Sequence, residues 1–83
     1  MWYLEAFDDK TDKLVGDYLI RDIDEPSLRR FLKDNGDDYD DEGFGPFTYE
    51  VGNKNGLPEI LRYIENPPDV EDFLSYFVSF YDE

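Results

Sequence analysis

Carboxylates are the commonest side chains in this sequence that could do chemistry, and six of them lie within nine residues: Asp34, Asp37, Asp38, Asp40, Asp41 and Glu42. An oxygen-rich run that contains glycine could bind calcium, could pair with arginine side chains of a protein partner, or could form a solvated loop. The spacing of the helix–loop–helix calcium motif, with its distal glutamate, is not met. We therefore expect a solvated loop or a contact surface, keep metal binding as a minor alternative, and expect no cofactor.

The residue types that most enzymes use are missing. The sequence has no Cys and no His, which excludes thiolate nucleophiles, the usual general base and the commonest metal ligand. Two carboxylates could act as acid and base at a glycosidase-like site, but 22 Asp and Glu residues supply such pairs by chance. We also expect so short a chain to lack a substrate cleft of roughly 300 Å³ or more. We therefore predict no enzymatic activity.

The net charge limits the possible partners. Lys and Arg number 8 against 22 Asp and Glu, so the formal net charge at pH 7 is −14. Such a polyanion is repelled by nucleic acid and by anionic membrane surfaces. No apolar run approaches the roughly 20 residues of a membrane-spanning helix, and residues 1–3 lead into a strand pattern rather than a signal peptide. We expect no direct binding to nucleic acid or membrane, and a cytoplasmic protein.

Length and aromatic content predict one folded domain over residues 1–83. Aromatic residues make up 18% of the chain, and each can bury about 150–250 Å², whereas acidic disordered chains are poor in aromatics. The chain is therefore expected to fold in spite of its own charge repulsion. The sequence leaves the oligomeric state open between a monomer and a weak dimer.

Hydrophobic periodicity predicts the elements that position these side chains. Strand patterns cover residues 2–7, 14–23, 47–51 and 73–81, and residues 8–13 form a polar turn. Helical spacing covers residues 24–35, with Asp24 as the N-cap, and residues 57–65. The expected fold class is α+β: an antiparallel sheet of about four strands, with one or two short helices packed on one face and the other face partly open.

The same patterns assign strand faces. Alternation over residues 2–7 separates Trp2, Leu4 and Ala6 from Tyr3, Glu5 and Phe7. The last strand is the most apolar, so we expect it to be central and to fill the core on both faces, with Tyr76 or Tyr81 turned to the open side. An open face that carries Glu and Tyr is a candidate binding surface.

Three segments follow the pattern of a known family. Residues 4–23, LEAFDDKTDKLVGDYLIRDI, carry Leu4, Phe7-Asp8, Thr11-Asp12, Leu14, Gly16-Asp17 and Arg21-Asp22-Ile23. The chain closes with Tyr76-Phe77-Val78-Ser79-Phe80, and between them lie Tyr49-Glu50-Val51 and Leu57-Pro58. In these segments the sequence resembles the cloacin immunity protein family. The acidic loop from Gly36 to Gly43 is longer than in that family, and the residues around it have no clear counterpart.

This resemblance implies a partner and a mode of action. Cloacin immunity proteins are small acidic inhibitors in the bacterial cytosol, which bind the basic nuclease domain of a toxin that cleaves ribosomal RNA. They do so through an antiparallel sheet whose exposed face and adjoining loops carry acidic and aromatic groups. They do no chemistry themselves.

Charge and aromatic content agree with such a role by a separate route. Electrostatic steering raises association rates to the order of 10⁸–10⁹ M⁻¹s⁻¹ at low salt, against about 10⁵–10⁶ without it, while tight binding needs anchors such as Tyr, Trp or Arg. Tyrosines stand beside carboxylates at several points of the sequence. The expected toxin-binding residues are Glu5, Asp8, Asp17, Asp37, Asp38, Tyr39, Asp40, Asp41, Glu42, Tyr49, Glu50 and Tyr76.

Two other functions remain open at the level of sequence. An acidic DNA mimic could block a nucleic-acid-binding protein, but it would need carboxylates in extended, phosphate-like rows. Here the acids are concentrated in one loop and scattered over the first two strands. The last possibility is a small structural domain whose acidity serves only its hydration.

Overall fold

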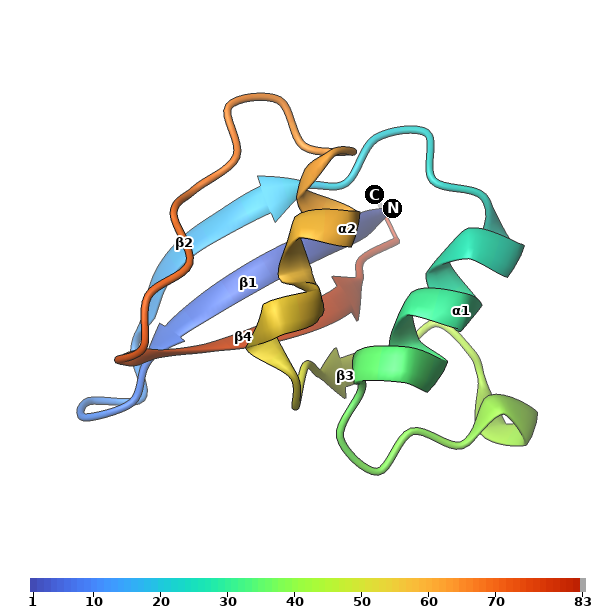
Figure 1. Cartoon of the computed structure of the whole chain (residues 1–83), viewed down its shortest axis with the longest axis horizontal. Helices are drawn as coiled ribbons and strands as arrows, with labels where there is room; N and C mark the ends of the chain where they lie inside the picture. Colours follow the sequence, from blue (N-terminus) through green and yellow to red (C-terminus); the bar gives the residue numbers. More distant parts are fainter. Residues whose placement is uncertain (83) are drawn as a thin grey trace.

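The protein is built on a four-stranded antiparallel sheet. The computed structural model describes residues 1–82, and its elements in chain order are β1 (Trp2–Asp8), β2 (Leu14–Leu19), α1 (Glu25–Asn35), the 3-10 turn η1 (Asp41–Gly43), β3 (Thr48–Glu50), the 3-10 turn η2 (Lys54–Gly56), α2 (Leu57–Leu61) and β4 (Leu74–Phe80). The strand order is β2-β1-β4-β3, with every neighbouring pair antiparallel. Both helices pack on the same side of the sheet (Figure 1). The predicted α+β class is confirmed, and β4 is central as predicted.

An aspartate builds the turn between β1 and β2. Oδ1 of Asp8 accepts hydrogen bonds from the backbone N–H groups of Lys10, at 2.8 Å, and Thr11, at 3.1 Å. The Asp8 N–H donates to the carbonyl of Lys13 at 2.9 Å. Such an Asx turn satisfies backbone donors where the ladder of the two strands ends, so the polar run over residues 8–13 closes the predicted hairpin.

Helix α1 begins and ends where the sequence predicts. Oδ1 of Asp24 accepts a hydrogen bond from the Ser27 N–H at 2.7 Å, and Pro26 lies in the first turn, where its missing N–H costs nothing. At the other end, the Gly36 N–H donates to the carbonyl of Leu32 at 2.7 Å. The helix is therefore fixed at both ends by local hydrogen bonds, and its apolar stripe faces the sheet.

The hydrophobic core lies between the helices and one face of the sheet. Its main members are at most 6% exposed: Leu4, Ala6, Leu28, Phe31, Leu32, Leu57, Ile60, Ile64, Tyr76 and Val78. Of the two faces that the alternation along β1 separates, the one with Leu4 and Ala6 points into this core. In β4, only alternate residues reach this core, while Phe77 lies on the opposite face. The expectation that β4 fills the core on both faces is wrong, because no helix or strand of residues 1–82 covers that face.

Strand β2 ends earlier than predicted. It stops at Leu19 instead of Ile23, because the chain then turns toward α1. Asp22 adopts the left-handed region at φ 59°, and the Arg21 N–H donates to the carbonyl of Tyr63 at 2.8 Å. Both features direct the chain out of the sheet.

Helix α2 is also shorter than predicted. It ends at Leu61, whereas the periodicity continues to residue 65. The N–H groups of Tyr63 and Ile64 bond to carbonyls three residues back, on Ile60 and Leu61. This tighter 3-10 pattern keeps Ile64 in the core without extending the α-helix.

Within the described residues 1–82, four residues other than glycine adopt left-handed backbone conformations. They are Asp12, Asp22, Asp38 and Asn66, with φ between 54° and 59°. Asp and Asn tolerate this region better than most residues, because their short polar side chains can bond locally. Part of the acidic content therefore serves the connections between elements.

Candidate binding surface

The uncovered face of the sheet carries acidic but no basic side chains. Directly paired residues of neighbouring strands share a face, so the registers place Glu5 of β1, Asp17 of β2 and Glu50 of β3 on the same side. None of the four strands contains Lys or Arg. All basic residues lie in the helices and connections, which leaves this face negative as well as open.

Glu5 is the buried carboxylate of this face. It is 6% exposed, and its Oε1 accepts a hydrogen bond from the Ser79 hydroxyl at 2.5 Å, while Oε2 accepts one from the Tyr81 hydroxyl. The hydrogen bond to the carboxylate raises the pKa of Tyr81. Among residues 1–82, no Lys or Arg lies within ion-pairing distance of Glu5. Glu5 is thus held by two hydroxyls but has no counter-ion in this part of the chain.

A hollow of about 300 Å³ opens beside Glu5. It is lined by Tyr3, Glu5, Leu14, Asp17 and Tyr81. The rings of Tyr3 and Tyr81 meet edge to face, with their centroids 5.7 Å apart. Leu14 is 49% exposed and Tyr81 45%. The hollow therefore combines two aromatic rings, an aliphatic wall, the buried carboxylate of Glu5 and the exposed carboxylate of Asp17.

A second aromatic pair extends this face. The rings of Phe7 and Phe77 also meet edge to face, with centroids 5.3 Å apart, and both residues are half-buried. Each ring keeps exposed area because no element covers it. Such rings offer contact area to a partner.

The acidic loop between α1 and β3 carries several exposed carboxylates. Asp37, Asp38, Asp40 and Glu42 are exposed, and none of them forms an ion pair within residues 1–82. Asp40 caps η1 by accepting a hydrogen bond from the Glu42 N–H at 3.1 Å. The Asp37 N–H donates to the carbonyl of Glu50 at 2.9 Å. The loop therefore adds negative charge at the β3 edge of the sheet.

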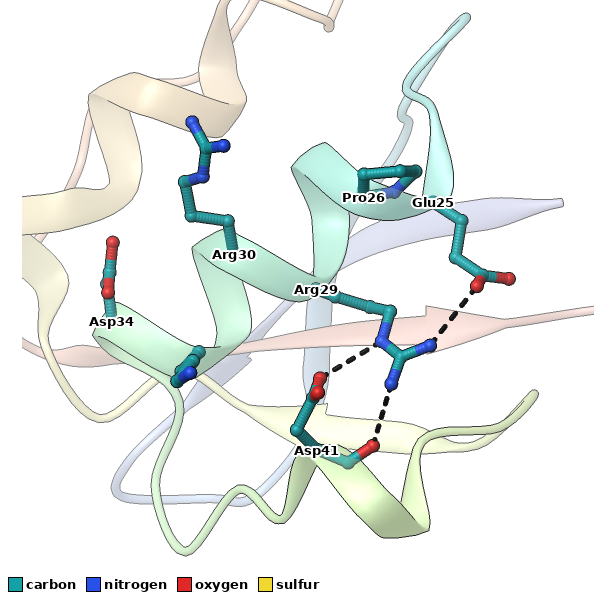
Figure 2. A pocket seen from close by; sticks show the side chains of 7 residues that line it. Glu25, Pro26, Arg29, Arg30, Asp34 and Asp41 are labelled. Carbon is teal, nitrogen blue, oxygen red and sulfur yellow. Dashed lines mark hydrogen bonds and ion pairs between the residues drawn. The ribbon is translucent and has the colours of Figure 1, made fainter.

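Asp41 serves the fold instead, because it ties this loop to α1. Its Oδ1 accepts a hydrogen bond from Arg29 Nε at 3.0 Å, and Arg29 also bonds to the Asp41 carbonyl and to Glu25 (Figure 2). The same Oδ1 accepts a hydrogen bond from the Tyr39 hydroxyl at 2.8 Å. Arg29, followed by Tyr39, holds the pKa of Asp41 below its ordinary value, and Asp41 raises the pKa of Arg29. Burial and then the Asp41 bond raise the pKa of Tyr39 to about 12. The Asp41 carboxylate is thus already engaged within the chain.

The side chains around Arg29 border an open hollow of about 640 Å³ (Figure 2). The expectation that this chain is too small for a hollow of such size is therefore wrong. Its lining consists of Glu25, Pro26, Arg29, Arg30, Lys33, Asp34 and Asp41. Within this set, Arg29 forms ion pairs with both Glu25 and Asp41, so the hollow offers space beside a structural ion-pair network.

Tyr39 and Tyr49 belong to an aromatic cluster on the helix side of the sheet. Tyr49 pairs with Val78 of β4, so it shares the covered face. Its ring stacks on Phe44, with centroids 5.9 Å apart, and lies 5.5 Å from the ring of Tyr39. The Tyr49 hydroxyl accepts from the Gly45 N–H at 2.8 Å and donates to the Gly45 carbonyl. These two tyrosines therefore fasten the acidic loop and lie apart from the open face.

Two further residues that were expected to contact the partner, Tyr76 and Asp8, are engaged within the fold. Tyr76 is 1% exposed and pairs with Ala6 on the covered face. Its hydroxyl accepts from the Glu71 N–H at 2.9 Å, and burial raises its pKa. Tyr81, and not Tyr76, faces the open side. The prediction that Tyr76 contacts the partner is therefore wrong. The Asp8 carboxylate is engaged in the hairpin turn.

The open face also contains residues that the sequence analysis did not name as contacts: Tyr3, Phe7, Phe77, Ser79 and Tyr81. Alternation along β1 was the available signal for Tyr3 and Phe7. The others required the register between the first and last strands, which joins Ser79 to Glu5 across 74 positions. No local pattern contains that information.

In the described part of the chain, no group of three or more acidic side chains is placed to hold a metal ion. No helix in residues 1–82 has the length and apolar character that crossing a membrane requires.

The chain belongs to a family described as a domain of unknown function (DUF7683), whose model matches residues 1–79. Comparison with curated proteins and with solved structures finds no significant match. The family description assigns no activity.

Proposed function

We propose that this protein is an immunity-type inhibitor, which binds and neutralises the basic nuclease domain of a bacterial ribonuclease toxin that acts on ribosomal RNA. The observation that carries the proposal is an open sheet face whose strands bear carboxylates and no basic side chain. The open face bears Glu5, Asp17 and Glu50 without a basic residue in any strand, whereas α1 carries Arg29 and Arg30 on the other side of the sheet. A nuclease domain needs basic side chains to hold RNA, so its surface complements this face.

The same face supplies the apolar contacts that charge alone cannot give. Electrostatic complementarity acts mainly on association rate and specificity, and affinity comes from buried anchors, among which tyrosine is enriched. Tyr3, Tyr81, Phe7 and Phe77 form two ring pairs there. The resemblance of residues 4–23 and 76–80 to cloacin immunity proteins supports the same role. Such an inhibitor acts by covering its target in the cytoplasm and catalyses nothing.

The alternative, an acidic DNA mimic, fits this arrangement less well. A mimic needs carboxylates in continuous rows that follow the phosphates of a duplex. The carboxylates of the open face come from three different strands and alternate with aromatic rings. Interleaving of this kind favours a surface that recognises a folded protein.

Co-expression tests the proposal. Candidate basic nuclease domains of bacterial ribonuclease toxins would each be produced in a laboratory bacterium with and without this protein, and growth and the integrity of ribosomal RNA would be measured. We expect growth and intact RNA only when the protein is present. The variant Glu50→Lys should protect less well than the helix-side variant Glu59→Lys, which changes the same charge on α2. Cleaved RNA in cells that contain the folded parent protein would contradict the proposal.

A further inference from the structure

The buried carboxyl group of Glu5 has no basic partner within residues 1–82. It is 6% exposed, and its two oxygens each accept one hydroxyl, from Ser79 and Tyr81. A buried carboxylate without a cation loses much of its hydration. The ion pairs within residues 1–82 join Arg29 to Glu25 and Asp41 on the helix side, and Arg21 to Glu65. The open face therefore presents a hydrogen-bonded anion with unfilled acceptor capacity, since each carboxylate oxygen can accept two bonds.

We propose that the hollow beside Glu5 receives an arginine side chain of the partner protein, with its guanidinium between the two carboxylates and the two tyrosine rings. This inference rests on the proposed function, because it identifies the group through which a basic partner would be recognised. Asp17 lies directly opposite Glu5 in the β1–β2 ladder, so a cation entering between them meets two negative charges.

The shape and lining of the hollow favour a guanidinium over an ammonium. Its volume of about 300 Å³ lies at the lower limit of small-molecule pockets, which suits one long side chain. The Tyr3 and Tyr81 rings lie on its wall, and arginine stacks on aromatic faces while its planar fork bonds carboxylates in pairs. Leu14 offers an apolar wall to the methylene stem.

The occupant has to come from another molecule. The lining of the hollow contains no Lys or Arg, and no ion pair within residues 1–82 includes Glu5 or Asp17. A second copy of this chain would bring a further charge of −14, and like charges across an interface are repulsive. A basic protein has the opposite charge and carries arginine on its surface, so charge complementarity assigns the hollow to it.

Titration of the full chain with short peptides tests this site directly. The probe is the blocked tripeptide Gly-Arg-Gly, compared with its citrulline and lysine counterparts, at low ionic strength. Backbone amide chemical shifts are followed by NMR. We expect the arginine peptide to shift the amide resonances of Tyr3, Glu5, Asp17 and Tyr81 selectively. The citrulline peptide should bind at least about tenfold more weakly.

Matched variants separate the hollow from general charge attraction. Glu5→Gln keeps the shape and removes the charge. Asp17→Asn does the same at an exposed position whose side chain forms no hydrogen bond within residues 1–82. Each should weaken arginine binding by about tenfold, whereas Glu59→Gln on α2 should leave it within about twofold, as expected for a remote surface charge. Uniform shifts over all acidic segments, equal binding of lysine, or unchanged binding by Asp17→Asn would overturn the inference. Growth protection in the co-expression assay together with such a negative titration would refute the arginine site and leave the proposed function standing.

Discussion

Leucine truncations on the two sides of the sheet test whether one face is open, on which both proposals depend. Leu32 of α1 is fully buried, and Leu14 of β2 is 49% exposed on the face that no helix covers. Leu14→Ala and Leu32→Ala delete the same atoms. Their effects on the free energy of unfolding should differ, because only one of the two sites lies inside a packed core.

The magnitudes follow from burial. Leu32→Ala removes fully buried groups and leaves a cavity, so it should cost about 3–4 kcal/mol. Leu14→Ala removes a side chain that keeps half of its surface in water, so the lost transfer free energy is about 1 kcal/mol, with no enclosed cavity. A domain of this size has a stability of roughly 4–12 kcal/mol. Leu32→Ala would therefore remove a large share of it, and Leu14→Ala a small one.

Urea unfolding followed by tryptophan fluorescence measures both variants, because Trp2 packs beside Phe44 and Phe80 in the fold. The dependence of the unfolding free energy on urea should stay unchanged, so that the midpoint reports stability. Equal losses for the two variants would refute the reasoning. Equal losses would mean that Leu14 is buried in solution. A urea midpoint that rises with protein concentration would then show that self-association buries it.

Two further predictions concern charge. The double variant Glu42→Lys with Glu50→Lys should slow association with the basic nuclease domain by at least about tenfold at low salt and by much less at high salt; stopped-flow rates equal to those of the parent would count against this surface. Tyr39 has a pKa raised from its ordinary value of 10.0 to about 12, so its neutral form is favoured in the folded state. Its contribution to stability is complete below pH 10 and is lost as the pH rises toward 12. Absorbance titration of phenolate should therefore show a late component that Tyr39→Phe removes; an unchanged titration curve would show that Tyr39 ionises with the exposed tyrosines.

The sequence was sufficient for elements whose signals are local. Asp24, Pro26 and Gly36 mark the ends of α1 by capping chemistry that acts within a few residues. Alternation along β1 correctly separated Leu4 and Ala6 from Glu5. The predicted ends of β2 and α2 were too late in the sequence. The apolar spacing continues beyond both elements, because the residues that follow pack on the core from turns.

The binding surface was less accessible to sequence reasoning. Proximity of tyrosine and aspartate along the chain suggested contacts at Tyr39 and Tyr49, but their rings pack on the helix side of the sheet. The partners of Glu5 lie at the far end of the chain. Their position depends on the pairing of β1 with β4, which is set by the whole fold.

The left-handed conformations of Asp12, Asp22 and Asp38 decide how the acidity of this protein can be dissected by mutagenesis. Alanine at these positions would carry a steric penalty from its Cβ as well as the loss of a charge, so an alanine scan would confuse strain with recognition. Asparagine tolerates the same backbone geometry and is already present at Asn66. Substitution to asparagine would therefore report the role of each charge separately from that of the turn.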